Sequence, residues 1–276
     1  MLIPILTAFG VFVLLGAFIG LMLAFASKKF HVETDERVPQ VLECLPGANC
    51  GGCGYAGCAA LAEKIVNGEA KVNACTVGGD ETASKISEIM GVTAEKAERM
   101  RAQVMCSGNT ACTSKRANYS GIADCRAAHM LGGGDRTCRS GCLGLGTCVA
   151  ACPFDAITIQ NGTAVVDYIK CRGCGVCVAA CPRDVISLIP YGAPHWIGCS
   201  SVSVGKETRD DCELGCIGCG LCAKNCPENA ISVTSHLASI DYSKCTNCGL
   251  CVSKCPRKII WTGTVCGTDG ILITRV

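Results

Sequence analysis

The sequence predicts an α+β protein in which an N-terminal apolar helix precedes several small cysteine-rich modules. Of its 276 residues, 27 are cysteine and 33 glycine, whereas the aromatic residues are only 2 Trp, 5 Tyr and 6 Phe. So few aromatic side chains do not fill one large hydrophobic core. The cysteines recur in closely spaced runs, and strand-like alternation separates the runs. Bonds to cysteine sulfur must therefore help to organise the chain.

The charged residues exclude two classes of protein. Lys and Arg number 25 against 23 Asp and Glu, which gives a formal net charge of +2 at pH 7. This balance lacks the basic excess of nucleic-acid-binding proteins and the acidic excess of disordered tails. We therefore expect no nucleic acid among the partners.

Residues 1–29 are predicted to form a transmembrane anchor. The stretch from Leu2 to Ala26 carries no charge, and about 25 residues at 1.5 Å each exceed the roughly 30 Å of a bilayer's hydrocarbon core. A cleaved signal peptide is the alternative, but its apolar segment would be shorter and would follow a basic residue. Lys28 and Lys29 come directly after the stretch. By the positive-inside rule they predict a single-pass protein whose soluble part is cytoplasmic.

Residues 30–79 are predicted to form a small metal-binding domain. Its four cysteines have the spacing C-x2-C-x4-C-x16-C and are Cys50, Cys53, Cys58 and Cys75. Glycines among them allow tight turns around a bulky anionic group, and Ala59 to Asn67 reads as a helix ended by Gly68. A 4Fe-4S cluster fits this spacing, and a closed zinc site is the alternative. Cys44 falls outside the pattern.

Residues 80–137 are predicted to be a helical connector with extra cysteines. The apolar residues of 80–105 have helical spacing that is broken at Gly91, which predicts two helices. The spacing of three further cysteines suggests a sixth cluster, with Cys199 or Cys212 as its fourth ligand. The three are Cys106, Cys112 and Cys125. The alternative is that these thiols are buried as small hydrophobic side chains.

Three later runs share the spacing C-x2-C-x2-C-x3-C-P, which is the bacterial ferredoxin run for 4Fe-4S clusters. They begin at Cys171, Cys216 and Cys245. A fourth run is a variant with longer loops and consists of Cys138, Cys142, Cys148 and Cys152. Zinc sites usually use two separated pairs of cysteines, so zinc is a poor alternative for these runs.

The runs pair into two ferredoxin-like modules, 138–190 and 216–276, which a linker of residues 191–215 joins. The pairs repeat with a period of about 74 residues. Each pair encloses strand-like alternation around a short turn, with Asn161-Gly162 as a hairpin signal in the first module. The fourth cysteine of a run ligates the cluster of its partner run.

This crossover predicts four clusters in the modules, so that the chain holds five clusters, or six with the extra cysteines. The predicted ligand sets are Cys138, Cys142, Cys148 with Cys181; Cys171, Cys174, Cys177 with Cys152; Cys216, Cys219, Cys222 with Cys255; and Cys245, Cys248, Cys251 with Cys226. The roles of Cys44 and Cys266 stay open.

The remaining residues indicate no catalytic centre. The four histidines are scattered without metal-binding spacing, and the sequence contains neither a nucleotide-binding glycine motif nor a P-loop. No catalytic residue is therefore predicted. Several redox centres without substrate chemistry are typical of a protein that conducts electrons.

The motifs in their order resemble the B subunit of the Rnf complex. The resemblance rests on residues 45–58 (LPGANCGGCGYAGC), the variant run from Cys138 to Cys148, and the ferredoxin runs behind one apolar helix. It covers essentially the whole chain, which has four ferredoxin runs where shorter family members have two. The resemblance implies an ion-translocating ferredoxin:NAD+ oxidoreductase of the bacterial inner membrane. This subunit would take electrons from reduced ferredoxin and pass them to the complex's membrane and flavin subunits, so that the oxidoreductase activity belongs to the complex.

Two other classes remain as alternatives. Residues 50–75 are also similar to a segment of corrinoid iron–sulfur proteins, in which a cluster reduces a cobalt cofactor. A redox sensor is the non-enzyme alternative, but it would need an output module. After Cys255 the sequence has only a short strand-like tail, Gly270 to Val276.

Overall fold

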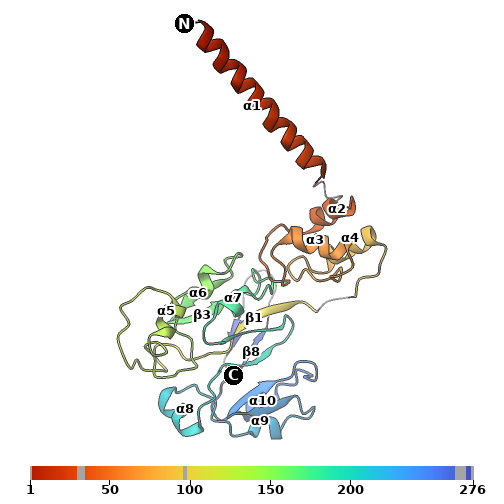
Figure 1. The fold of residues 1–276 in the computed structure, drawn as a ribbon. Coiled ribbons are helices and arrows are strands. Elements are labelled where there is room, and N and C mark those ends of the chain that lie inside the picture. The colour runs from red at the N-terminus through yellow and green to blue at the C-terminus, as the bar shows by residue number, and fades with distance from the viewer. Residues whose placement is uncertain (1, 30–34, 96–97, 265–271, 275–276) are drawn as a thin grey trace.

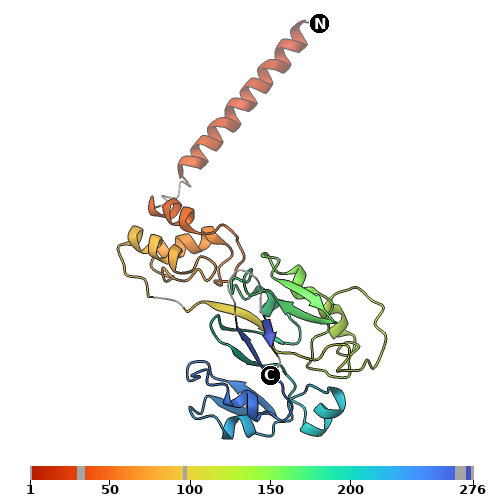
Figure 2. The same ribbon diagram turned by 180° about the vertical axis from the view of Figure 1, so that it is seen from behind.

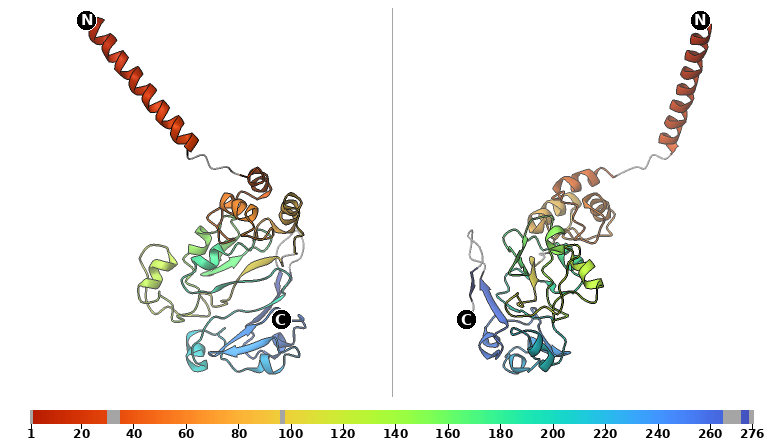
Figure 3. Two further views of the ribbon diagram at one scale, coloured as in Figure 1. Left: turned by 45° about the vertical axis from the view of Figure 1, so that its right-hand side comes forward. Right: turned by 90° about the vertical axis from the view of Figure 1, so that its left-hand side faces the viewer.

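The computed structural model describes residues 2–29, 35–95, 98–264 and 272–274. One long helix stands clear of a body in which small helices and strands follow one another from the N-terminal side to the C-terminal side (Figure 1). The view from behind and two side views show the same arrangement (Figures 2 and 3). The helices are α1 (Leu2–Lys29), α2 (Arg37–Cys44), α3 (Cys58–Val66), α4 (Gly79–Met90), α5 (Cys125–Met130), α6 (Thr147–Ala150), α7 (Val176–Ala180), α8 (Gly205–Asp211), α9 (Leu221–Lys224) and α10 (Leu250–Lys254). The strands are β1 (Met100–Val104), β2 (Ile157–Gln160), β3 (Thr163–Val166), β4 (Ile186–Pro190), β5 (His195–Ile197), β6 (Ile231–Thr234), β7 (Leu237–Ile240), β8 (Ile260–Thr264) and β9 (Leu272–Thr274).

The N-terminal helix α1 corrects the prediction of a membrane anchor. In the part of the chain that the structure describes, no helix has the length and apolar character needed to cross a membrane. The predictions of a transmembrane anchor over 1–29 and of a single-pass protein of the inner membrane are therefore wrong.

The domain after α1 is a small helical unit. Helices α2, α3 and α4 bury an apolar core that includes Val41, Leu61, Ile65 and Ile86. The helix predicted from Ala59 is confirmed as α3, and Gly68 lies two residues beyond its end with φ +74°. Glycine adopts this left-handed conformation at little cost, so it stops the helix where the sequence indicates.

The connector is only partly helical. Helix α4 ends at Met90, and Gly91 caps it in the left-handed backbone conformation. The second predicted helix is absent from the described residues, because β1 occupies its C-terminal part. This strand pairs antiparallel with β4. The fully buried Arg101 of β1 donates to the Ala193 carbonyl at 2.8 Å and stacks 3.8 Å from the Tyr168 ring. These long-range contacts outweigh the local helical spacing.

Both predicted hairpins are confirmed. Strands β2 and β3 pair antiparallel across Asn161 and Gly162, and β6 pairs with β7 across Ser235 and His236. All four turn residues have positive φ, as a two-residue type I′ turn requires. The strand-like tail is also confirmed, because residues 272–274 form β9 next to β8.

Each module has one further strand pair that brings a distant segment against it. Strand β1 joins β4 in the first module, and β5 joins β8 in the second. The predicted linker 191–215 therefore contains structure of its own, namely β5 and α8. Cysteines belong to the buried core of both modules.

Candidate metal centres

Four short helices begin directly after a left-handed glycine in the cysteine runs. These N-terminal glycines are Gly146, Gly175, Gly220 and Gly249, which precede α6, α7, α9 and α10. Only glycine takes this conformation at low cost. The turn changes the chain direction between consecutive cysteines, so that cysteines close in sequence surround one space.

Two cavities in the C-terminal module are each lined by four cysteines. One is lined by Cys216, Cys219, Cys222 and Cys255. The other is lined by Cys226, Cys245, Cys248 and Cys251. In each cavity three cysteines come from one run and the fourth from its partner run. The structure thus brings together the same groups as the two predicted ligand sets.

The first module has a similar cavity with a different set of cysteines. Its four cysteines are Cys125, Cys142, Cys148 and Cys181. Cys138, whose spacing predicts a common cluster with Cys142 and Cys148, lines a separate cavity. Cys125, which was assigned to a possible sixth cluster, takes part here.

The second predicted set of the first module lies around α7. Burial raises the pKa of Cys177 to about 12, and repulsion from Cys171, Cys174 and Cys152 acts in the same direction. The four thiols are therefore close enough to influence one another. A thiolate is costly in such surroundings without a cation, and the positive charge of iron would offset this cost.

The N-terminal domain holds the first predicted set. Helix α3 begins at Cys58, whose amide donates to Asn49 Oδ1 at 2.8 Å. Burial raises the pKa of the Cys75 thiol, and repulsion from Cys58 and Cys53 contributes. Cys44 packs against the same apolar core as these cysteines.

Backbone amides point at several sulfur atoms. Such hydrogen bonds stabilise a thiolate and help to set the reduction potential of an iron–sulfur cluster. The N–H groups of Gly78, Ala102, Ala156 and Ala230 donate to the Sγ atoms of Cys75, Cys171, Cys152 and Cys226 at 3.3 to 3.4 Å.

The cysteine groups fit 4Fe-4S clusters. Four cysteines line each of the cavities described above, and a 4Fe-4S core takes four thiolate ligands. Within the described residues, no group of three or more His, Cys, Asp or Glu is placed to hold a metal ion.

The structure groups the extra cysteines differently from the predicted sixth set. Cys106 and Cys212 share a cavity with Cys138 and Cys199. Cys112 does not line it, and its Sγ lies 3.1 Å from Asn109 Oδ1. Cys266 lies outside the described residues. The sequence contains a signal for this grouping, because Cys138 occupies the same place in the internal repeat as Cys212.

Comparisons with known proteins agree with this picture. Residues 45–77 match the family model described as "Putative Fe-S cluster", and residues 135–182 and 215–259 each match a "4Fe-4S dicluster domain". The chain is 47% identical over 246 residues to the B subunit of the Na(+)-translocating ferredoxin:NAD(+) oxidoreductase complex of Acetobacterium woodii, which covers 89% of this chain and 74% of that protein. It is 43% identical to the B subunit of the ion-translocating oxidoreductase complex of Methanosarcina acetivorans, over 84% of this chain and 88% of that protein. The B subunit of the proton-translocating ferredoxin:NAD(+) oxidoreductase complex of Clostridium ljungdahlii is also 43% identical, over 85% of this chain and 84% of that protein. The chain therefore belongs to the family of Rnf complex B subunits, the iron–sulfur subunits of ion-translocating ferredoxin:NAD+ oxidoreductases, and its 4Fe-4S domains serve electron transfer.

Proposed function

We propose that this chain accepts electrons from reduced ferredoxin at its C-terminal module and delivers them from its N-terminal domain to another subunit of the complex. The proposal places one 4Fe-4S cluster at each of five cysteine groups, one in the N-terminal domain and two in each module. Each cluster supplies a one-electron carrier when bound. The chain's own residues hold the clusters, shield them from water and set their order.

The observation that carries the proposal is the exposure of the cysteines. Among the described cysteines, only Cys219 and Cys248 are exposed, and both belong to the C-terminal module. Each lines one of the two cavities of that module. A soluble donor can therefore approach these centres more closely than those in the rest of the described chain.

The other end of the path is a contact between the N-terminal domain and the first module. A Cβ atom added to Gly52 would clash with the carbonyl group of Cys174, so the two backbones touch. Burial raises the pKa of the Cys174 thiol, and the nearby Cys50 contributes to this increase. The centre of the N-terminal domain therefore lies next to a centre of the first module, which supports electron transfer between them.

The order can be tested with the full chain in the assembled complex. In the Cys53→Ser variant, ferredoxin should still reduce the remaining clusters rapidly, as measured by bleaching of their visible absorbance. The same variant should no longer reduce NAD+. Cys248→Ser should instead slow the first bleaching step, and Cys44→Ser serves as the matched control. Loss of bleaching with Cys53→Ser, together with unchanged NAD+ reduction, would show that the direction is wrong.

A further inference from the structure

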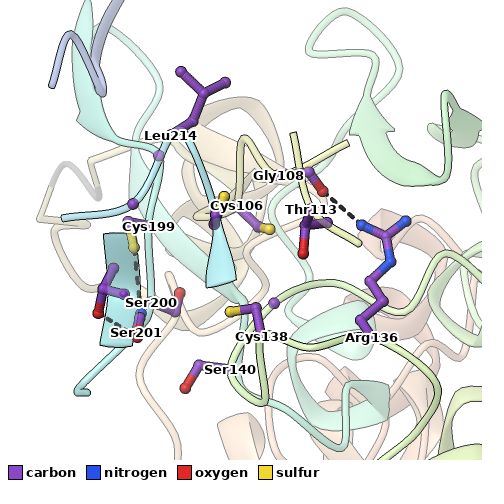
Figure 4. A pocket seen from close by; sticks show the side chains of 15 residues that line it. Cys106, Gly108, Thr113, Arg136, Cys138, Ser140, Cys199, Ser200, Ser201 and Leu214 are labelled. Atoms are coloured by element: carbon purple, nitrogen blue, oxygen red, sulfur yellow. Dashed lines mark hydrogen bonds between the residues drawn. The ribbon is translucent and has the colours of Figure 1, made fainter. Parts of the chain in front are cut away.

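A cavity between the two modules is lined by four cysteines from four separate segments. The cavities inside the modules are likewise lined by four cysteines each. Figure 4 shows Cys106, Cys138 and Cys199 arranged around this space. The complete set is Cys106, Cys138, Cys199 and Cys212.

Two glycines keep the space between these sulfur atoms open. A Cβ atom on Gly108 would lie 3.2 Å from Cys212 Sγ and 3.7 Å from Cys106 Sγ. A Cβ atom on Gly141 would lie 3.3 Å from Cys138 Sγ and 3.7 Å from the same Cys106 sulfur. Cys106 therefore lies near both Cys138 and Cys212, and no side chain from these two positions fills the space.

The internal repeat explains two of the four cysteines. The variant run aligns without a gap with the run that begins at Cys216. Leu145 of the variant run stands at the position of Cys219 in that later run. In this alignment the ferredoxin run begins at Cys142 and lacks its second cysteine. Cys138 lies before that run. The equivalent pairs are Cys138/Cys212, Cys142/Cys216, Cys148/Cys222 and Cys152/Cys226.

The other two cysteines are equivalent in structure. Cys106 follows β1, which pairs with β4, and Cys199 follows β5, which pairs with β8. The preceding residues make matching bonds, because Met105 N–H donates to the Val185 carbonyl at 2.7 Å and Gly198 N–H donates to the Ile259 carbonyl at 2.8 Å. Each module, together with the strand paired against it, therefore supplies two cysteines to the cavity. One follows the pairing strand, and the other occupies the repeat position of Cys138 and Cys212.

Two of the sulfur atoms connect the cavity to the centres on either side. The Cys142 amide donates to Cys106 Sγ at 3.3 Å, and the Cys216 amide donates to Cys199 Sγ at 3.3 Å. Cys142 lines the cavity of the first module and Cys216 that of the second. The cavity between the modules thus adjoins one predicted centre of each.

Two equivalent arginines hold the remaining loops. Arg183 donates to the carbonyls of Cys138 at 2.9 Å and Gly141 at 2.7 Å. Arg257 donates to the carbonyls of Cys212 at 3.1 Å and Gly215 at 3.3 Å. Each arginine directly follows the Cys-Pro pair that ends a run, so the folding of a module also positions its cysteine at the shared cavity.

From this arrangement we propose a sixth 4Fe-4S cluster that joins the two modules. Its ligands are Cys106, Cys138, Cys199 and Cys212. Cys125 replaces Cys138 as the fourth ligand of the first module's cluster, beside Cys142, Cys148 and Cys181. The proposal rests on the function proposed above, in which electrons pass from the C-terminal module to the first module, and it supplies the carrier between them.

Iron and sulfide analysis of the full chain, reconstituted without oxygen, tests the site. Six clusters correspond to about 24 irons. The pair Cys106→Ala and Cys199→Ala should remove about four irons, and adding Cys138→Ala should remove no more. The pair Cys44→Ala and Cys112→Ala is the matched control and should remove none.

Three outcomes of the iron analysis would overturn the proposal. One is an unchanged iron content in the Cys106→Ala and Cys199→Ala pair. Another is a further loss of about four irons when Cys138→Ala is added, which would return this cysteine to the first module. A loss of about two irons from the pair would indicate a 2Fe-2S centre and would also contradict the proposal. If these variants fail to fold, Cys199→Ser provides the same test, because the electron paramagnetic resonance signal of one cluster should change and an unchanged spectrum would refute the site.

The rate of cluster reduction by ferredoxin distinguishes a failure of this site from a failure of the proposed order of electron transfer. In the Cys106→Ala and Cys199→Ala pair, fast bleaching should be confined to the two clusters of the C-terminal module. If iron is lost as expected but the first module is still reduced rapidly, the site stands and the proposed order of electron transfer is wrong.

Discussion

The two ferredoxin-like modules share a fold but differ in their surroundings. Cys174 and Cys248 are the second cysteines of equivalent runs, yet Cys248 is exposed whereas Cys174 is half-buried beside Gly52. In the other pair of runs, Leu145 replaces the exposed Cys219. The repeat has thus kept the hairpins that determine the fold and changed the positions that face outward. The first module is enclosed between neighbours, and the second presents its centres to solvent.

The largest loss of stability is expected when iron is removed from the chain. This experiment tests whether both modules depend on iron for folding. Cysteines form part of both module cores, and small domains with little other apolar burial fold with their metal. The iron-free chain should lose the cooperative thermal transition of the modules, measured by near-ultraviolet circular dichroism. Helical signal from α2 to α4 should persist, since their core is mainly aliphatic. A cooperative transition at the temperature of the iron-loaded protein would contradict this expectation.

The next effect concerns the cysteine that distinguishes the first module. Cys125→Ala should reduce occupancy of this module's cluster, with a loss of up to about four irons. Adding Leu145→Cys recreates the complete ferredoxin run of the C-terminal module and should restore the iron. Iron analysis of the single and double variants measures both effects. If Leu145→Cys gives no rescue, the comparison between Leu145 and Cys219 does not extend to ligation.

A smaller effect should follow from disturbing the cover over Cys174. Gly52→Ala places a methyl group against the Cys174 carbonyl, and such overpacking costs about 1–3 kcal/mol. Separation of the N-terminal domain from the first module should become roughly 5- to 140-fold more frequent. We expect slower NAD+ reduction by the complex with unchanged bleaching by ferredoxin. Gly192→Ala is the matched control, because a Cβ there meets no atom within 4 Å.

The smallest effect compares the two equivalent arginines. Arg183 is buried, whereas Arg257 is partly exposed, although both bind loop carbonyls. Hydrogen bonds from a charged group contribute most where water cannot replace them. Arg183→Gln should lower the free energy of unfolding by about 1–3 kcal/mol and Arg257→Gln by about half as much, measured by thermal unfolding of the iron-loaded chain. Equal losses would show that burial does not distinguish the two modules here.

Local signals predicted the parts of the fold that local chemistry determines. The hairpin at Asn161-Gly162 and the end of α3 near Gly68 depend on residues that tolerate positive φ. The helical spacing before Cys106 was misleading, because β1 exists through its pairing with β4, more than 80 residues away in the chain. The apolar N-terminal stretch predicted a helix correctly but not a membrane span.

The same division applies to the candidate site. Spacing alone grouped the cysteines of the C-terminal module as the structure does. The structure places Cys138 in a different group, because this cysteine lines the cavity shared with Cys106, Cys199 and Cys212. That position agrees with its register with Cys212 in the internal repeat. The partnership of Cys106 with Cys199 has no local signal, because it follows from the way each connecting strand pairs with a module.

The cysteines around the shared cavity also constrain the order in which the chain can mature. The N-terminal set is complete once Cys75 has been synthesised, but the cavity between the modules needs Cys106 and Cys212, and Arg257 holds the Cys212 loop. About 150 residues separate Cys106 from Arg257, which is at least about 8 s of synthesis at 5–20 residues per second. If the cavity holds the proposed sixth cluster, Cys106 must remain a reduced thiol without its partners during that interval. Protection of this thiol by the cell's reducing systems, before any iron is inserted, would therefore limit the yield of correctly assembled protein.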